Sequence, residues 1–323
     1  MSEHLASIGG APAAPGAAAG LAAAPAPPAA ARAAASRAAL PWPLGAAVLG
    51  TTAIVVGLLW DISWHASIGR DSFWTPAHLV IYLGGILCGA SAGWVALATT
   101  FAGTAEQRAA AVGLWGFRAP LGAWVAIWGS IAMLTSAPFD DWWHNAYGLD
   151  VKIISPPHLL LAAGIFATQL GAMLQALAAQ NRAAPLAGGA GAAGNRLAWV
   201  YAYAGGLLVA LVSTLFLEYS APNRQHGALF YEIACAAWPL VLVGVACGSR
   251  LRWPATTVAA IAMAVRLAMT WILPLFPATP RLAPIYNPVR HMWPPLFPEL
   301  LVVPAVALDL LLRRAGRLGV AGG

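Results

Sequence analysis

Two short segments of the chain each contain one aspartate followed by two histidines at spacings that suit a metal ion. They are Asp61, His65 and His78, the first triad, and Asp140, His144 and His158, the second triad. Residues four apart share one face of a helix, so each aspartate and its first histidine should point the same way. The second histidine of each triad opens the next predicted helix, so three side chains from two adjacent helix ends can meet.

One carboxylate and two imidazoles suit copper, zinc or iron and often leave coordination positions open, whereas imidazole disfavours magnesium and calcium. A polar network without metal, in which the aspartate and histidines bond one another, would use the same residues. In the second triad we assign Asp140 rather than Asp141 as the ligand, because only Asp140 lies four residues before His144. Asp141 would point about 100° away on the same helix.

The two segments match beyond the triads. With one residue inserted in the second, the order Asp, Trp, His, Gly, Asp, Pro, His, Leu and Gly coincides. Such a match predicts an internal repeat, a helical hairpin present twice in one orientation, whose copies pack as neighbours. The second aspartates of the pattern, Asp71 and Asp150, follow the first histidine by six residues and could orient a ligating imidazole.

A run of residues in the first segment has a counterpart in a known family: Trp64, His65, Arg70, Asp71, Thr75, Pro76, Ala77 and His78. This run resembles the metal-site segment of the C subunit of particulate methane and ammonia monooxygenases. That family has one site with an Asp and two His at the first triad's spacing. Its other site has an Asn and two His at the second triad's spacing, and here Asp140 stands where the family has Asn.

The resemblance implies copper at both triads, and either an oxygen-activating monooxygenase or a subunit of one, without establishing oxygen activation. The second segment is matched by ligand spacing only, with Leu149 in place of the arginine. Nothing in the chain resembles the soluble copper domains of that family's partner subunit. Two other functions use the same residues: a membrane protein for copper transport or delivery, and a metal-free structural membrane subunit. The chain offers no Met-rich or Cys-rich track for Cu(I).

The elements that must position the triads are membrane helices. Apolar residues make up 60% of the 323 residues and charged residues 9%, against about 25% charged in soluble domains. The sequence therefore predicts an all-α fold, a polytopic membrane helix bundle whose main partner is the lipid bilayer. We expect eight spans, at 43–60, 78–101, 120–138, 158–179, 197–217, 228–248, 255–275 and 296–312.

Basic residues set the expected orientation, because cytoplasmic loops carry an excess of Lys and Arg. Eleven lie on the side of the N-terminus: Arg32, Arg37, Arg108, Arg118, Arg182, Arg196, Arg250, Arg252, Arg313, Arg314 and Arg317. Five lie on the other side: Arg70, Lys152, Arg224, Arg281 and Arg290. We therefore expect both termini in the cytoplasm and the triad loops outside an inner (plasma) membrane. This orientation accounts for the net charge of +6, so we expect no nucleic-acid partner.

The chain divides into four predicted regions. Residues 1–40 form a disordered Ala/Pro-rich cytoplasmic tail, 41–180 the half that carries both triads, 181–195 a cytoplasmic linker, and 196–323 a second half with degenerate hairpins. Further partners would be other membrane subunits or a second copy of the chain.

Four ionisable residues lie inside predicted spans, where charge is costly and partners are expected: Glu232, Arg266, Glu299 and Asp309. We expect Glu232 to pair with Arg266. We expect Asp309 to pair with Arg313 and Arg314.

Overall fold

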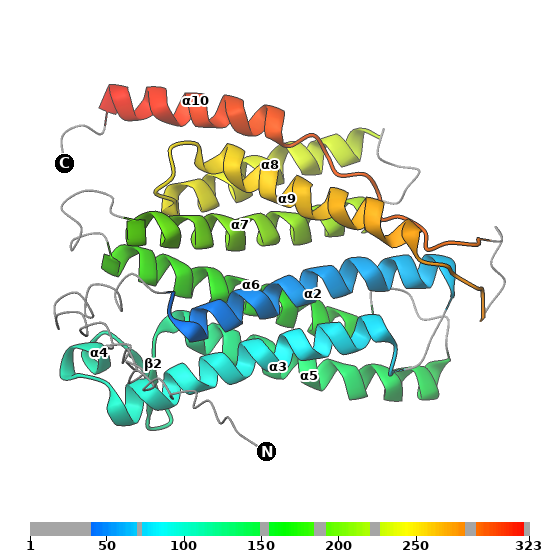
Figure 1. Cartoon of the computed structure of the whole chain (residues 1–323), viewed down its shortest axis with the longest axis horizontal. Helices are drawn as coiled ribbons and strands as arrows, with labels where there is room; N and C mark the ends of the chain where they lie inside the picture. The colour runs from blue at the N-terminus through cyan, green and yellow to red at the C-terminus, as the bar shows by residue number, and fades with distance from the viewer. Residues whose placement is uncertain are drawn as a thin grey trace, which may run out of the picture. The chain divides into compact units, whose positions relative to one another are not determined.

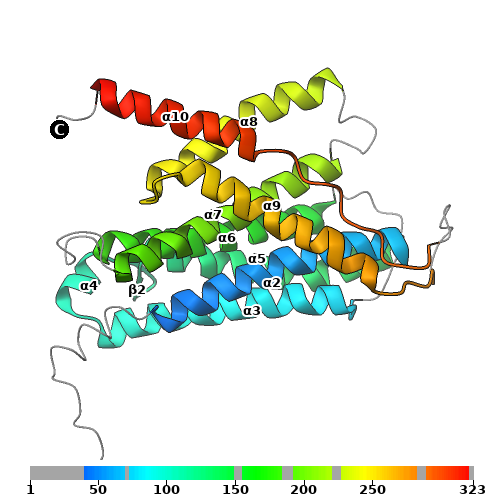
Figure 2. The same cartoon turned by 45° about the horizontal axis from the view of Figure 1, so that its top comes forward.

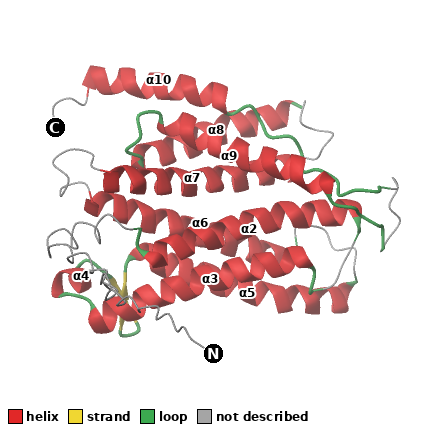
Figure 3. Cartoon of the chain, in the orientation of Figure 1, coloured by secondary structure: helices red, strands yellow, loops and turns green. Residues whose placement is uncertain are grey.

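The computed structural model describes residues 40–69, 73–148, 155–183, 192–219, 227–281 and 289–319. The predicted tail lies outside these ranges except for Leu40, as do Asp71, Asp150 and His226. The described part is an all-α polytopic membrane bundle, as predicted from composition (Figures 1 and 3). Seven of its helices are long and apolar enough to cross a membrane: α2 (Trp42–Ser67), α3 (Pro76–Leu97), α5 (Leu121–Tyr147), α6 (Pro156–Ala183), α7 (Ala192–Tyr219), α8 (Ala228–Gly248) and α9 (Pro254–Ile272).

The seven helices run up and down as consecutive neighbours. Helices α2 and α3 form one antiparallel hairpin, α5 and α6 form a second, and the two hairpins pack together through α3 and α5. Helix α7 joins them to α9 from the middle of the bundle, while α8 and α10 (Val302–Gly319) lie on the side away from α3 and α5 (Figures 1 and 2). Both triads therefore belong to hairpins that contact each other.

Glycine lets the two helices of each hairpin approach closely, and it does so at corresponding positions. A Cβ on Gly50 would lie 2.8 Å from the carbonyl oxygen of Gly84, and a Cβ on Gly84 would lie 2.6 Å from that of Gly50. In the other hairpin, the corresponding distances between Gly129 and Gly164 are both 2.8 Å. Membrane helices often use small residues in this way to bring their backbones together. We call each of these contacts a glycine seam.

The prediction of an eighth span at 296–312 was wrong. Helix α10 begins only at Val302. Its 18 residues include four charged ones: Asp309, Arg313, Arg314 and Arg317. The described residues before it, from Val289 to Leu301, form no regular helix. Pro294, Pro295 and Pro298 explain this, because proline lacks the amide hydrogen that continues a helix. The apolar residues predicted a span here. The prolines shorten the helix, and the charges that follow make its composition unlike that of a membrane span.

The chain between α3 and α5 contains short elements that were not predicted. The π-helical turn η1 (Ala98–Ala102) extends α3, and α4 (Ala105–Ala109) follows it. Strands β1 (Val112–Leu114) and β2 (Phe117–Ala119) then pair in an antiparallel hairpin. Its two-residue turn, Trp115 and Gly116, has positive φ at both positions, which is typical of a type I′ turn. Trp115 packs edge-on against Trp128 of α5, with ring centroids 5.5 Å apart.

The ionisable residues of the second half have partners other than those predicted. Arg266 of α9, only 1% exposed, donates to Thr214 of α7 at 2.6 Å and to the carbonyl of Leu296 at 3.0 Å. Glu232, its predicted partner, is exposed. The buried carboxylate of Asp309 accepts hydrogen bonds from the amides of Ala255 and Thr256 at the start of α9. It thus caps a helix rather than pairing with neighbouring arginines.

The C-terminal part of the bundle is completed by two non-helical stretches. After α9, the 3₁₀ turn η2 (Leu273–Leu275) leads into residues 276–281, which pair with 289–293. The amide of Ala278 donates to the carbonyl of Arg290, and that of Met292 to the carbonyl of Phe276, both at 3.0 Å. We call 276–281 and 289–293 together the strand-like pair. It lies at the end of the bundle where α2 ends (Figure 1).

Candidate metal centre

The helices that carry the first two residues of each triad continue past them and stop at a glycine. Helix α2 runs to Ser67 and α5 to Tyr147, so Asp61 and His65, and likewise Asp140 and His144, each share a helix face. The chain then turns at Gly69 with φ +92° and at Gly148 with φ +93°. Other residues rarely adopt this backbone conformation, which explains why the glycine recurs at the same offset in both segments.

The returning helices begin alike. Thr75 precedes α3, and its hydroxyl accepts a hydrogen bond from the amide of His78 at 3.4 Å. Ser155 precedes α6, and its hydroxyl accepts one from the amide of His158 at 3.5 Å. A hydroxyl at this position satisfies a helix amide that has no partner within the helix. Each second histidine is therefore held in the first turn of its helix, beside the end of the preceding one.

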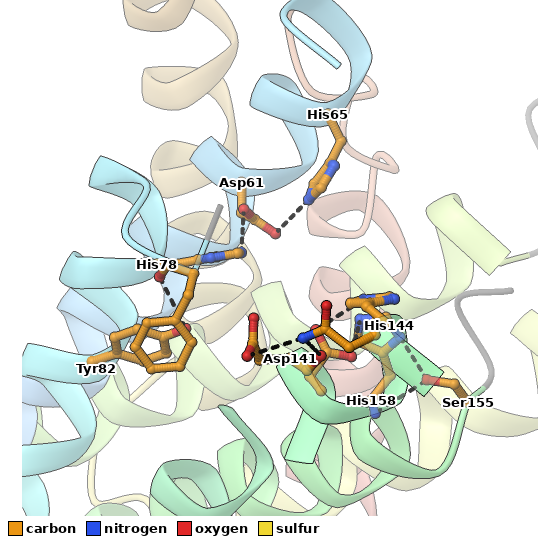
Figure 4. A network of polar contacts seen from close by, with 11 residues as sticks. Asp61, His65, His78, Tyr82, Asp141, His144, Ser155 and His158 are labelled. Atoms are coloured by element: carbon orange, nitrogen blue, oxygen red, sulfur yellow. Dashed lines mark hydrogen bonds and ion pairs between the residues drawn. The ribbon is translucent and has the colours of Figure 1, made fainter. Parts of the chain in front are cut away.

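Each triad converges on its carboxylate, as Figure 4 shows for the histidines around Asp61. The Nε2 atoms of His65 and His78 lie 3.6 and 3.1 Å from the two oxygens of Asp61. Around Asp140, the Nε2 atoms of His144 and His158 lie 3.1 and 3.6 Å from the two carboxylate oxygens. The ring centroids within a triad are 6.4 Å apart in the first and 6.3 Å apart in the second.

Each triad could hold a single ion if its three ligand atoms moved somewhat closer together. One ligand atom from each of the three residues lies within 4.8 Å of the other two. Ligand atoms bonded to one ion at about 2.1 Å are separated by about 3.0–3.4 Å for bond angles between 90° and 109°. Asp61 Oδ1 and Asp140 Oδ1 are both buried and accept no hydrogen bond of ordinary geometry from the described residues. A positive ion between the aspartate and its histidines would satisfy both oxygens.

The two triads are neighbours at one end of the bundle. Both come into view together in Figure 4. Asp61 and His65 lie close enough to His158 for an electrostatic interaction, so the first triad is near the second. This proximity agrees with the expectation that the two hairpins pack side by side.

Asp141 takes no part in the second triad. It is exposed, and its carboxylate accepts a hydrogen bond from the side chain of Asn145 at 3.4 Å. The triad instead contains Asp140, four residues before His144. In the structure Asp140, and not Asp141, lies beside the two histidines.

Two neighbours of the triads, Ser155 and Tyr82, were not predicted. Ser155 Oγ lies 2.9 Å from Nδ1 of His158, which leaves Nε2 directed at Asp140. The ring of Tyr82, one turn after His78, lies 6.0 Å from that imidazole between centroids. A hydroxyl three residues before a histidine at a helix start could have suggested the Ser155 contact, since such a residue also caps the helix.

The second half of the chain adds no further triad within the ranges that the structure describes. His291 lies in the strand-like pair, opposite Pro277. Glu299 accepts a hydrogen bond from Ser213 of α7. His226 lies outside the described residues, as does the side chain of Glu218.

Comparison with protein-family models, curated proteins and solved structures finds no match to this chain.

Proposed function

We propose that this chain is an integral membrane protein that binds two metal ions, one in each triad. The observation that carries the proposal is the convergence of two imidazoles on each carboxylate, with three ligand atoms within 4.8 Å in both places. Two nitrogen ligands and one oxygen ligand leave room for further coordination by water or a small molecule. The corresponding glycine seams, helix ends and helix starts support the interpretation of the hairpins as two copies of one unit.

Copper is the proposed metal, and this rests on the resemblance of the first segment to the monooxygenase C subunit. In the site, Asp61 or Asp140 would supply the anionic ligand and the histidines would bind through Nε2. Copper held by these residues would supply redox chemistry to the site. Such a site would suit either an oxygen-activating monooxygenase or a subunit of one.

Metal analysis of the chain purified in lipid tests the proposal. The wild type should carry two copper ions per chain, His65→Ala one, and the double variant His65→Ala/His144→Ala none. His291→Ala is the matched control, because this exposed histidine lies outside both triads. The electron paramagnetic resonance spectrum of the Cu(II) form should show two nitrogen ligands at each site. Equal metal content in the wild type and the double variant would instead identify the triads as metal-free Asp–His networks.

A further inference from the structure

A pair of serines holds the helix end that carries the first triad. Ser63 and Ser67 of α2 are 1% and 0% exposed, respectively. The hydroxyl of Ser63 donates to the carbonyl of Trp293, and the amide of Trp293 donates to the hydroxyl of Ser67. The Ser67 hydroxyl also donates to the carbonyl of Ser63 at 2.6 Å. Both backbone groups of Trp293 are therefore bonded to α2.

These serines occupy the face of α2 that lies away from the triad. Each follows a triad residue by two positions, which is about 200° around a helix. One side of the last two turns thus presents Asp61 and His65, while the other binds Trp293 of the strand-like pair. The contact extends one residue further, because the amide of Arg281 donates to the carbonyl of Ile68 at 2.9 Å. Residues more than 200 positions later in the chain therefore fix the end of α2.

Among the residues that the structure describes, the second hairpin has no equivalent contact. The positions that correspond to Ser63 and Ser67 hold Trp142 and Ala146, and neither side chain has a hydroxyl. Trp142 stacks on Phe139 with centroids 6.0 Å apart, and Trp143 packs on Tyr147 at 4.4 Å. The end of α5 is thus stabilised by rings of its own helix, whereas the end of α2 is bound to a distant segment.

We propose that Ser63 and Ser67 are positioning residues that bind the end of α2 to the strand-like pair and so orient Asp61 and His65 of the first triad alone. In its metal-binding part, this inference rests on the proposed function. Binding equilibria are reciprocal, so a strand-like pair that favours the metal-binding geometry of α2 is itself stabilised when the first triad binds metal. The two sites then differ in regulation although their ligands are alike. The first responds to whatever docks on or displaces the strand-like pair, and the second does not.

Copper affinity measured one site at a time provides the first test. In full-length protein in lipid, Asp140→Ala isolates the first triad and Asp61→Ala isolates the second. Ser63→Ala and Ser67→Ala should each weaken copper binding by the first triad about tenfold, the lower end of the range for residues that orient metal ligands. They should leave the second triad within about twofold of its starting affinity, since its ligands lie on other helices. Equal losses at both triads, or none at the first, would overturn the proposal.

The matched control is Ser136→Ala. This serine is 2% exposed and so is buried like Ser63 and Ser67, but its hydroxyl donates to the carbonyl of Met133 within α5 rather than to a distant segment. A second pair of variants avoids altering the buried serines. Arg281→Pro removes the amide that bonds Ile68, while Arg281→Ala keeps it. Only the proline variant should weaken the first triad.

Hydrogen exchange provides a readout that needs no metal. In the metal-free protein, Ser67→Ala should speed amide exchange at Trp293 and in the last turn of α2, and Ser136→Ala should not. Absence of this change would refute the positioning role even if copper binds normally. Conversely, a chain that binds no copper but shows the change would refute the proposed function and leave the contact between α2 and the strand-like pair standing.

Discussion

The hairpin of α2 and α3 and the hairpin of α5 and α6 bring the same three ligand types together by the same local means, yet different parts of the protein support them. Both use a glycine seam, a glycine at the helix end and a hydroxyl before the returning helix. The first hairpin is then fixed by hydrogen bonds to Trp293, and the second orients His158 through Ser155. Ligand geometry can therefore be encoded within about 20 residues, whereas the rigidity of a site depends on long-range contacts.

The largest effect should come from filling a glycine seam. Gly129→Val would place a Cβ 2.5 Å from the amide nitrogen of Thr168, and Gly50→Val would place one 2.8 Å from the carbonyl oxygen of Gly84. Backbone atoms cannot move aside as a flexible side chain can, so each variant should lose about 3 kcal/mol of stability or more. Thermal unfolding in lipid would measure this. Gly93→Val is the control, because its Cβ would meet nothing within 4 Å. A loss confined to one hairpin would break the equivalence of the two seams.

Removal of the Ser155 hydroxyl should give the next largest effect. Ser155→Ala leaves Nδ1 of His158 without its 2.9 Å contact, so the imidazole is less well oriented toward Asp140. Copper affinity of the second triad should fall about tenfold, or 1.4 kcal/mol. The first triad, measured in the same variant, should be unchanged. An equal fall at both triads would indicate a general loss of structure rather than the loss of one orienting contact.

The glycines at the two helix ends should tolerate alanine at a moderate cost. Gly69→Ala and Gly148→Ala each force a side chain into positive φ, which should lower stability by about 1 kcal/mol or more. The two losses should be similar, because the two φ values are 92° and 93°. Unfolding midpoints of the two variants, compared with Gly93→Ala, would measure them. A much larger loss in one variant would show that the two helix ends are less alike than their backbone angles indicate.

The smallest effect is expected at Asp141. Its exposed carboxylate accepts a hydrogen bond from Asn145 and does not belong to the second triad, so Asp141→Ala should leave metal content unchanged. Asp140→Ala should remove one metal ion, because it deletes the only carboxylate of that triad. Equal metal loss from the two variants would refute the helical register of α5 proposed here.

The sequence predicted the features that depend on local pattern. Apolar blocks predicted all seven of the helices that are long and apolar enough to span a membrane in the described part of the chain. The four-residue spacing of Asp61 and His65 predicted that these two side chains share one helix face. The contact between Ser63 and Trp293 could not be predicted, because no local periodicity relates residues 230 positions apart. The same holds for Arg266, whose partners lie on α7 and in the stretch before α10.

The error at 296–312 has a different origin. Hydropathy there is high enough for a span, but hydropathy does not register that proline removes backbone donors. In the resulting non-helical stretch, the carbonyl of Leu296 accepts a hydrogen bond from Arg266. A buried arginine in α9 is thus hydrogen-bonded by backbone that is not helical. At membrane depth such backbone is tolerated where it is buried in protein or lines a water-filled cavity.

The cap that Asp309 forms on α9 also has a consequence for biosynthesis. Chains emerge from the ribosome N-terminus first, so α9 is complete long before Asp309 is made. During that interval the amides of Ala255 and Thr256 lack the carboxylate that later binds them. Arg266 likewise lacks the carbonyl of Leu296 until that residue has been synthesised. Both ligand triads are synthesised earlier, on hairpins whose seams are already complete. Translation order therefore separates the two glycine seams, which can form as the hairpins emerge, from the contacts of α9 and of the end of α2, which depend on residues made late in the chain.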